Sequence, residues 1–495
     1  MTRVVVVGHG MVGSRLAEDL VAADPAAEVT VLGREPVPAY NRVLLSGVVA
    51  GTTAPDLLAL AGPPHPRLRV LTGVAATDVD RAGRLVTDDR GGHHPYDRLV
   101  LATGSAARVP AIQGVADDRG LVPGVFVLKD LADATGIVAA AAGARRAVVL
   151  GAGVLGVEVA TGLAARGLAV RVVHLGERLM DRQLGWEASQ VAVASLRRLG
   201  IAAHTGASVA GVVTHRGRLS AVRFSDGLEA AADLFVMCTG TVPETVLARR
   251  AGLACDRGVL VGEDLATDDP HVFAVGDCAQ PPAGATGLVA QGWEQARHLV
   301  AMLSARDSVA GMPTHDVVRV KASGLSVVSM GVSGDFDRED PRYRVLSLKD
   351  PERGRFVEVV VAGSRLAGAT CLGDAEVGAT LSALYTRATT VPDDPAMLMV
   401  RALAGGGAAP AREPADLADA DRVCTCNSVS AGAVRAAVRS GCASAAEVSA
   451  ATRASTGCGD CRSVVEALVA TTAIPADPTA DHEEPPVPDL VRSES

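Results

Sequence analysis

A glycine-rich segment of six residues occurs twice in this chain, each time directly after a short apolar run. The first copy, Gly8-His9-Gly10-Met11-Val12-Gly13, follows the strand-like residues Arg3–Val7. The second copy, Gly151-Ala152-Gly153-Val154-Leu155-Gly156, follows Arg146–Leu150. In both copies a helical stretch and a second strand-like run come next. The pattern therefore predicts two βαβ units with G-x-G-x-x-G at the strand-to-helix turn.

The two units also end alike. Leu99-Val100-Leu101-Ala102-Thr103-Gly104 closes the first, and Phe235-Val236-Met237-Cys238-Thr239-Gly240 closes the second. A third apolar strand, His271–Val275, then runs into Gly276-Asp277. One such motif is weak evidence, but two copies in the same frame are hard to explain by packing alone. We predict an α/β fold in which one dinucleotide-binding domain, residues 1–115 and 241–311, contains a second, residues 116–240.

Each glycine of such a turn has a mechanical purpose. The first permits the tight turn, the second lets a pyrophosphate approach the backbone, and the third lets helix and strand pack closely. Free N–H groups and a partial positive charge at the helix N-terminus then favour the phosphates. The residues that we expect at the two sites from these turns are Gly8, Gly10, Met11, Gly13, Thr103, Gly104 and Gly276 for the first, and Gly151, Gly153, Gly156 and Gly240 for the second.

Acidic residues beyond the turns are candidates for the sugar hydroxyls. Glu35 lies just past the second strand of the first unit, where a carboxylate should bind the FAD ribose. In the second unit His174 ends the corresponding strand and Glu177 lies three residues on, so both NADH and NADPH stay open. Asp277 is a candidate for a ribityl hydroxyl of the flavin, or it caps the next helix. Glu158 is a candidate for the nicotinamide ribose, or an ordinary first-turn glutamate favoured by the helix dipole.

The rest of the chain predicts a β-rich α+β domain, a linker rich in Ala, Gly and Pro, a small helical domain and a disordered Pro-rich, acidic tail. These four segments are residues 312–404, 405–421, 422–473 and 474–495. Within the α+β domain, Arg319–Met330 and Phe356–Leu372 predict hairpins. In the helical domain, Ser444 and Glu447 form a capping-box pattern that predicts a helix start.

Four of the nine cysteines are paired by their spacing: Cys424 with Cys426, and Cys458 with Cys461. An odd total with this clustering indicates a metal site in a reducing compartment and not a disulfide framework. Four thiolates complete a 2Fe–2S cluster. Structural zinc is the main alternative, but zinc sites more often use two C-x-x-C pairs, so the C-x-C pair favours iron.

Composition restricts the setting. The formal net charge of −9 argues against general binding of nucleic acid, which needs clustered Lys and Arg. Gly8 comes too early for the apolar region of a signal peptide, and Gly or Arg interrupts the longer apolar stretches. We therefore expect no secretion signal, no membrane span and a cytoplasmic location.

Three motifs resemble a known family. They are Ala39-Tyr40-Asn41-Arg42-Val43-Leu44-Leu45-Ser46, His174-Leu175-Gly176-Glu177-Arg178-Leu179-Met180-Asp181-Arg182-Gln183-Leu184 and Val272-Phe273-Ala274-Val275-Gly276-Asp277-Cys278-Ala279. Together they resemble the reductase portion of the NAD(P)H-dependent assimilatory nitrite reductase large subunit, and the electron-transfer subunit of assimilatory nitrate reductase. The segment Cys424–Cys461 is similar to the bacterioferritin-associated ferredoxin-like 2Fe–2S domain that these proteins carry.

The resemblance implies a glutathione-reductase-like pair of nested domains, with FAD in the first and NAD(P)H in the second. By motif position it implies that Arg42 contacts FAD and that Trp293 lies beside the flavin ring. From the residues alone, Trp293 is equally a core aromatic. The implied activity is that of an FAD-dependent NAD(P)H oxidoreductase that passes electrons through a 2Fe–2S cluster.

The sequence departs from this family in three places. The full nitrite reductase continues into a sirohaem and 4Fe–4S domain, whereas no further cysteines follow Cys461 here. We therefore expect a separate catalytic subunit of nitrate or nitrite reduction as the partner. Gly47 stands where related ferredoxin reductases have Lys, and residues 241–244 lack the usual Arg and Asn, so the family's contacts are not carried over there.

Other functions fit fewer of these features. A ferredoxin or rubredoxin reductase-type flavoprotein would use the same donor chain for another acceptor. A disulfide or peroxide reductase needs a redox cysteine beside the flavin, and none lies near Tyr40–Ser46. A non-catalytic redox sensor would use the cysteine module to dock a partner. Steady NADH oxidation with an artificial acceptor separates an enzyme from such a sensor.

Overall fold

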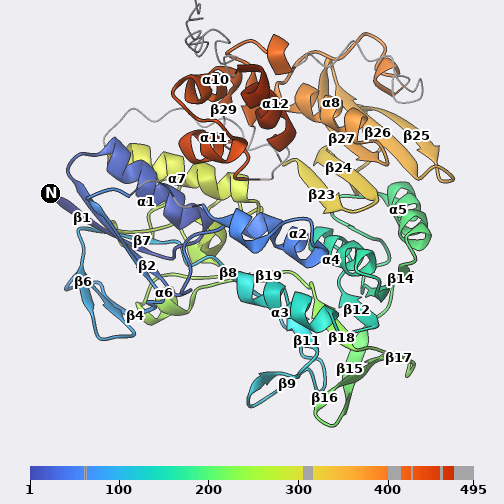
Figure 1. Cartoon of the computed structure of the whole chain (residues 1–495), viewed down its shortest axis with the longest axis horizontal. Helices are drawn as coiled ribbons and strands as arrows, with labels where there is room; N and C mark the ends of the chain where they lie inside the picture. The colour runs from blue at the N-terminus through green and yellow to red at the C-terminus, as the bar shows by residue number, and fades with distance from the viewer. Residues whose placement is uncertain are drawn as a thin grey trace, which may run out of the picture. The chain divides into compact units, whose positions relative to one another are not determined.

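The computed structural model describes residues 1–60, 62, 64–304, 316–399, 414–424, 427, 429–457 and 461–472. The chain divides into two compact units, Met1–Ala409 and Pro410–Ser495 (Figure 1). The predicted tail 474–495 lies outside the described residues, as do Cys426 and Cys458. No helix in the described ranges is long and apolar enough to cross a membrane.

A parallel five-stranded sheet forms the first dinucleotide domain, with strand order β21-β7-β1-β2-β3. Val4 to Val6 are buried in its middle strand, as expected for a parallel sheet that is covered on both faces. Helices α1 and α7 pack together beside it. The bounds of these elements are β1 Thr2–Val7, α1 Met11–Ala23, β2 Ala27–Gly33, β3 Leu68–Thr72, β7 Arg98–Leu101, β21 Val272–Ala274 and α7 Val289–Leu303.

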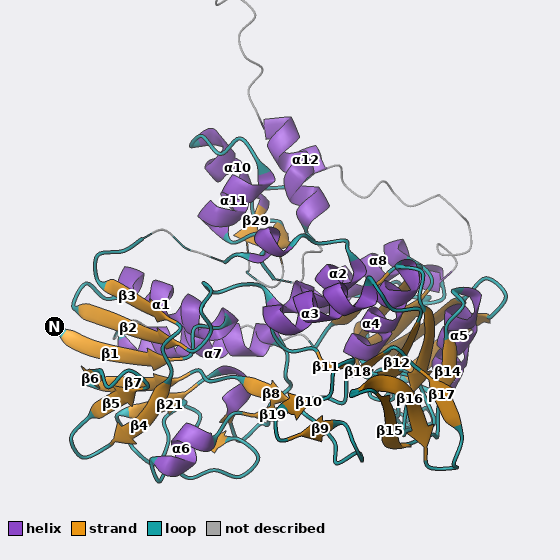
Figure 2. Cartoon of the chain, turned by 60° about the horizontal axis from the view of Figure 1, so that its bottom comes forward, coloured by secondary structure: helices purple, strands orange, loops and turns teal. Residues whose placement is uncertain are grey.

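A second parallel sheet repeats this order, as β11-β18-β12-β13-β14. Both predicted βαβ units are thereby confirmed. Because β21 returns to the first sheet after the second sheet is complete, the second domain is inserted into the first; Figure 2 shows the two sheets. The bounds are β11 Val125–Val127, α3 Leu131–Ala141, β12 Arg146–Leu150, α4 Val154–Ala165, β13 Ala169–Val173, α5 Trp186–Arg198, β14 Ala202–His204 and β18 Leu234–Met237.

Smaller elements complete these two domains. They include three-stranded antiparallel sheets in each domain and several two-stranded pairs. Their bounds are η1 Arg42–Leu44, α2 Leu45–Ala50, η2 Pro55–Leu58, β4 Ala76–Asp80, β5 Leu85–Asp88, β6 His93–Pro95, β8 Ser105–Ala107, β9 Ala116–Asp117, β10 Gly120–Leu121, β15 Val209–His215, β16 Arg218–Phe224, β17 Glu229–Ala231, β19 Thr241–Pro243, α6 Val246–Arg250, β20 Val259–Leu260, η3 Gly276–Cys278 and β22 Ala279–Gln280.

The predicted α+β domain is an antiparallel sheet with order β23-β24-β27-β26-β25, on which α8 packs. Both predicted hairpins are present, as β23–β24 and β26–β27. Alternate residues such as Val357, Val359 and Val361 face its core. The bounds are β23 Val318–Ala322, β24 Leu325–Gly331, β25 Arg344–Asp350, β26 Arg355–Ala362, β27 Arg365–Leu372 and α8 Ala375–Thr386.

The second unit is small and mainly helical. The predicted capping box is present, because Ser444 Oγ accepts from Glu447 N at 3.2 Å and the Glu447 carboxylate accepts from Ser444 N at 3.2 Å. Leu417, within the predicted linker, packs against the core of this unit. The bounds are η4 Pro414–Asp416, β28 Arg422–Cys424, β29 Val429–Ser430, α10 Ala431–Arg439, α11 Ala445–Thr452 and α12 Arg462–Thr472.

Candidate functional site

The first glycine-rich turn leaves space only at its middle glycine. Gly8 has φ of +118°, and a Cβ there would lie 2.1 Å from the Ala102 carbonyl oxygen. A Cβ on Gly13 would lie 2.1 Å from the Gly8 carbonyl oxygen. Gly10 is the N-cap of α1, and the nearest atom to a Cβ there is Arg42 Nε at 4.0 Å. This is the cradle that a pyrophosphate needs, with tight packing at the first and third glycines and open space at the second.

A cavity of about 790 Å³ opens beside this turn, at the carboxyl ends of the first sheet's strands. Cofactor sites in proteins have volumes of about this size and usually lie at this edge of a parallel sheet. Most of the residues predicted for the first site line it, namely Gly8, Gly10, Met11, Glu35, Arg42, Thr103, Gly104, Gly276 and Asp277. The structure therefore brings together, at one cavity, residues that are as far apart in the sequence as Gly8 and Asp277.

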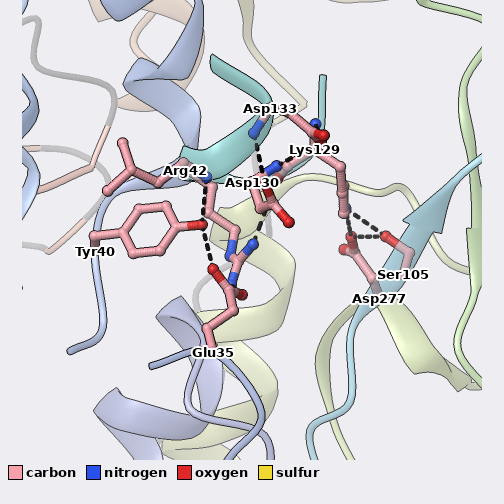
Figure 3. Close-up of polar contacts among 9 residues, drawn as sticks. Glu35, Tyr40, Arg42, Ser105, Lys129, Asp130, Asp133 and Asp277 are labelled. Atoms are coloured by element: carbon pink, nitrogen blue, oxygen red, sulfur yellow. Dashed lines mark hydrogen bonds and ion pairs between the residues drawn. The ribbon is translucent and has the colours of Figure 1, made fainter. Parts of the chain in front are cut away.

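Glu35 is held at the end of β2 by two side chains (Figure 3). The Tyr40 hydroxyl donates to Glu35 Oε2 at 2.7 Å and accepts from the Leu131 N–H at 2.9 Å. Burial raises the pKa of Tyr40, so its proton stays in place to be donated. Arg42 forms an ion pair with Glu35 and lies 4.7 Å from the centre of the Tyr40 ring. Carboxylate and guanidinium thus stand side by side at the cavity wall.

A second polar cluster surrounds Asp277 (Figure 3). The Lys129 ammonium donates to Ser105 Oγ at 2.6 Å and lies 3.4 Å from Asp277 Oδ2. Ser105 Oγ in turn donates to Asp277 Oδ2 at 2.6 Å. Burial lowers the pKa of Lys129. Asp277 therefore does not cap a helix; its carboxylate faces a partly buried cation at the cavity.

Lys129 and Ser105 were not among the residues predicted for the site. Both line the cavity. The Lys129 N–H is itself fixed, because it donates to Asp133 Oδ2 at 2.8 Å in the capping box of Asp130 that begins α3. The capping-box pattern Asp130-x-x-Asp133 is visible in the sequence, but nothing in it says that the preceding lysine reaches a site formed by another segment.

His9, the second residue of the turn, also lines the cavity. Its Nδ1 atom is buried and has no hydrogen-bond partner within the described part of the chain. Burial lowers the pKa of His9, so the ring is neutral at physiological pH. A buried polar atom without a partner in this place fits a ligand that supplies one.

Trp293 and Glu158 occupy packed positions. Trp293 is 2% exposed, and its Nε1 donates to the Met11 carbonyl oxygen at 3.1 Å between α7 and α1. This is the place of a core aromatic, and contact with a flavin stays a prediction. Glu158 is buried and accepts a 2.6 Å hydrogen bond from Ser46 Oγ of α2. Its predicted contact with a nicotinamide ribose likewise stays a prediction.

The second glycine-rich turn repeats the geometry of the first. Gly151 has φ of +104°, and a Cβ on Gly156 would lie 1.9 Å from its carbonyl oxygen. Gly153 is the N-cap of α4, and nothing lies within 4 Å of a Cβ there. Gly240 follows β18 with φ of +92°. Glu177 lies on the exposed segment after β13. The turn offers a second pyrophosphate cradle.

The cysteines near the two turns are not suited to disulfide chemistry. Burial raises the pKa of Cys238 to about 12, and the Glu158 carboxylate adds to the effect. Burial also raises the pKa of Cys278, which is fully buried beside Asp277. Both thiols are therefore protonated at neutral pH, whereas a redox-active cysteine needs an accessible thiolate.

In the second unit, Cys424 ends β28 and Cys461 directly precedes α12; both are buried. The neighbouring Cys424 thiol is the main cause that raises the pKa of Cys461, so the two thiols lie close together. The Ser455 N–H donates to Cys461 Sγ at 3.2 Å. The fold thus brings together one cysteine of each sequence pair and supplies an N–H to sulfur, a contact that tunes the potential of iron–sulfur clusters. The other two predicted ligands, Cys426 and Cys458, lie outside the described residues.

Two family models match the chain. The model of the pyridine nucleotide-disulphide oxidoreductases matches residues 2–301, and that of the BFD-like 2Fe–2S binding domain matches residues 422–471. The predicted cofactors FAD, NAD(P)H and a 2Fe–2S cluster are confirmed at the level of these domains. The second match also decides for a cluster domain over the zinc alternative.

Curated relatives match almost the whole chain. The NAD(P)H nitrite reductase of Bacillus subtilis (strain 168) is 32% identical over 472 residues, which are 94% of this chain and 57% of that protein. The assimilatory nitrate reductase electron transfer subunit of the same organism is 29% identical over 481 residues, 94% of this chain and 59% of that protein. The chain spans a little over half the length of these relatives.

The fold has a close counterpart among solved structures. A chain in the crystal structure of the covalent putidaredoxin reductase–putidaredoxin complex superposes with a TM-score of 0.70 at 24% identity. The match covers 82% of this chain and 99% of that one. The predicted glutathione-reductase-like pair of nested domains is confirmed.

Proposed function

This chain belongs to the pyridine nucleotide-disulphide oxidoreductase family, and we propose that it is the electron donor of a nitrate or nitrite reduction system. It is an NAD(P)H-dependent flavin oxidoreductase with a 2Fe–2S domain. A bound FAD would supply the chemistry that connects a two-electron donor, NAD(P)H, with a one-electron carrier such as the cluster. No side-chain acid or base is needed for that electron transfer. The residues of the chain would bind and orient the cofactors and tune their electron affinity.

The cavity at the first glycine-rich turn carries the proposal. We assign the FAD pyrophosphate to the open space at Gly10 and the N-terminus of α1, because the first N–H groups of a helix have no intrahelical partner and favour phosphate. Glu35 is the acceptor for the adenosine ribose hydroxyls, with Arg42 beside it. Asp277, steadied by Ser105, accepts from the ribityl chain.

The partly buried Lys129 brings a positive charge to the same cavity. Its ammonium would attract negative charge on a bound flavin, because opposite charges attract more strongly at a partly buried site. Asp277 keeps part of that charge neutralised at 3.4 Å. The pair would thereby influence how readily a bound flavin accepts electrons.

The second unit takes the electrons onward. Cys424, Cys426, Cys458 and Cys461 are the proposed ligands, and in the described pair the Cys424 thiol lies close enough to raise the pKa of Cys461. The buried position of both favours a cluster that is shielded from solvent.

The acceptor is proposed from the relatives. One is a nitrite reductase and another is the electron transfer subunit of an assimilatory nitrate reductase, and both match over 94% of this chain. This chain spans 57% of that nitrite reductase. We therefore propose for this chain only the electron-donating part of the relative's activity, and not its reduction of nitrite. The proposed partner is a separate nitrate or nitrite reductase catalytic protein.

The first test is an anaerobic titration of the purified protein with NADH and then NADPH, followed by absorbance and electron paramagnetic resonance. We expect flavin bleaching together with the signal of a reduced 2Fe–2S cluster. Addition of a nitrate or nitrite reductase catalytic protein together with its oxidant, nitrate or nitrite, should then return both centres to the oxidised state. Bleaching with no cluster signal, and zinc by metal analysis, would contradict the proposed path.

A cysteine variant tests the order of the two centres. Cys458→Ser should abolish the cluster signal and leave flavin reduction by NAD(P)H nearly unchanged, because the flavin receives electrons first. Cys442→Ser is the matched control, since Cys442 lies in the same unit but outside the two sequence pairs. Loss of flavin reduction together with the cluster would show that the serial order is wrong.

A further inference from the structure

The strand that should end in a ribose-binding acid ends in a histidine in the second dinucleotide domain. His174 follows β13, and its Nδ1 accepts from the Ala152 N–H of the glycine-rich turn at 3.4 Å. In the neutral ring the proton is therefore on Nε2. Burial lowers the pKa of His174, which keeps the ring neutral. This strand end thus holds the turn in place and supplies no negative charge.

A carboxylate from the next segment stands at that strand end instead. Asp181 Oδ2 lies 3.9 Å from His174 Nε2. The segment turns back there because Met180, at φ of +49°, donates its N–H to the Ala152 carbonyl oxygen at 2.8 Å. The Asp181 side chain is about half exposed, at 49%, so it is open to a ligand seated on the turn.

The arginine of this segment is engaged by another domain. Arg178 forms an ion pair with Asp335 of the α+β domain, and only 18% of its side chain is exposed. The guanidinium holds the pKa of Asp335 below its usual range, so the partner is ionised at neutral pH. Arg182 is exposed, where water and salt screen its charge.

The α+β domain also fixes the backbone of the segment. Ser329 Oγ donates to the Gln183 carbonyl oxygen at 3.3 Å. A Cβ on Gly334 would lie 2.8 Å from the Arg182 carbonyl oxygen, so the backbones of the two segments are in close contact there. The contacts of residues 329–335 therefore keep the Arg178 guanidinium paired and fix the backbone next to Asp181.

We infer that Asp181 and the Arg178–Asp335 ion pair make the second site selective for NADH over NADPH. The inference rests on the proposed function, in which this domain binds NAD(P)H, and it names the nucleotide. A carboxylate accepts hydrogen bonds from the two hydroxyls of an unmodified ribose. A 2′-phosphate would be repelled by Asp181, and it needs a free arginine, whereas Arg178 is already neutralised.

Direct binding to the flavin-loaded full chain tests this without catalysis. Isothermal titration with ADP-ribose and with 2′-phospho-ADP-ribose measures the two forms of the adenosine half. We expect ADP-ribose to bind more tightly by about tenfold or more, which corresponds to one modest charged contact. The ratio of kcat/KM for NADH and NADPH should follow the same order.

Two variants should narrow the preference. Asp335→Asn releases Arg178 and should strengthen binding of 2′-phospho-ADP-ribose by about fivefold, with little effect on ADP-ribose. Asp181→Asn should weaken the binding of ADP-ribose and strengthen the binding of 2′-phospho-ADP-ribose. Asp340→Asn is the matched control, because Asp340 pairs with Arg342 in the same α+β domain and should leave both affinities unchanged.

The outcomes are separable. Equal binding of the two probes by the natural protein, or an unchanged preference in both Asp335→Asn and Asp181→Asn, would overturn the inference while leaving NAD(P)H binding intact. Binding of neither probe would instead contradict the proposed function of the second domain.

Discussion

The two glycine-rich turns are alike in backbone and different in what surrounds them. Each turn follows a strand that carries an arginine near its start, and this arginine forms an ion pair with the aspartate that precedes a neighbouring strand. The pairs are Arg3 with Asp97 at 3.2 Å and Arg146 with Asp233 at 3.1 Å. Each has a glycine at positive φ followed by an open N-cap glycine. Beyond the third glycine the likeness stops.

In the first domain the polar groups of the cavity are fixed by short hydrogen bonds to one another, as between Tyr40 and Glu35 or Ser105 and Asp277. In the second domain the corresponding strand end carries neutral His174, and the nearby acid is oriented by a segment that the α+β domain holds. The turn therefore supplies general binding of a pyrophosphate, while the identity of the nucleotide depends on groups outside the turn.

The largest contrast should come from the two open glycines. Gly10→Val should weaken FAD binding by at least about a hundredfold, because the side chain occupies the space of the pyrophosphate. Gly153→Val should keep FAD and lose its reduction by NADH. Neither Cβ meets a close atom, so the apo-proteins should unfold at the same urea midpoint as the natural chain. A fully flavinated Gly10→Val protein would count against FAD in the first site.

A smaller effect is expected at Lys129, the partly buried cation of the first site. Lys129→Met leaves the Asp277 carboxylate without its cation and should weaken FAD binding by about tenfold to a hundredfold, the range of a charged hydrogen bond. Fluorescence titration of the apo-protein with FAD measures this. Lys349→Met removes a comparable ion pair, with Glu187, that is remote from the cavity and should leave FAD affinity unchanged. If Lys129→Met bound FAD with unaltered affinity, Lys129 would have no role in FAD binding.

The smallest effect concerns the feature that the two domains share. Their arginines hold the pKa of Asp97 and Asp233 below its usual value, so each pair stabilises the fold above the ordinary carboxyl pKa of about 3.9. That stabilisation is lost as the pH falls through the lower folded-state pKa. Both pairs are partly exposed, so the gain is small.

Asp97→Asn and Asp233→Asn should therefore each lower stability slightly at pH 7. Their difference from the natural chain should shrink toward zero below about pH 3, where the natural aspartates are protonated as well. Urea unfolding at pH 7, 4 and 2.5 measures the two variants side by side. A difference that persists at pH 2.5 would show that the aspartates act by packing and not by charge.

Much of the fold was open to prediction because it depends on local chemistry. The glycine-rich turns, the helices that follow them and the apolar strands on either side are encoded within about thirty residues each. The capping box of Ser444 and Glu447 and the pairing of the cysteines by spacing are local in the same sense. For the first site, Gly8, Gly10, Glu35 and Asp277 were predicted from the residues and Arg42 from the family resemblance, and all five line one cavity.

What the sequence by itself determined is thus the two dinucleotide folds and the spacing of the four cysteines that we propose as cluster ligands, since short-range periodicity and spacing encode them. Only the tertiary structure decided which side chains meet. Ser105 and Asp277 are 172 residues apart, and Arg178 and Asp335 are 157 apart. Such pairs form because segments distant in the sequence, from one domain or from two, pack against each other, and no local pattern records that packing. The same reason explains why Lys129 joined the site and why Glu158 is paired with Ser46.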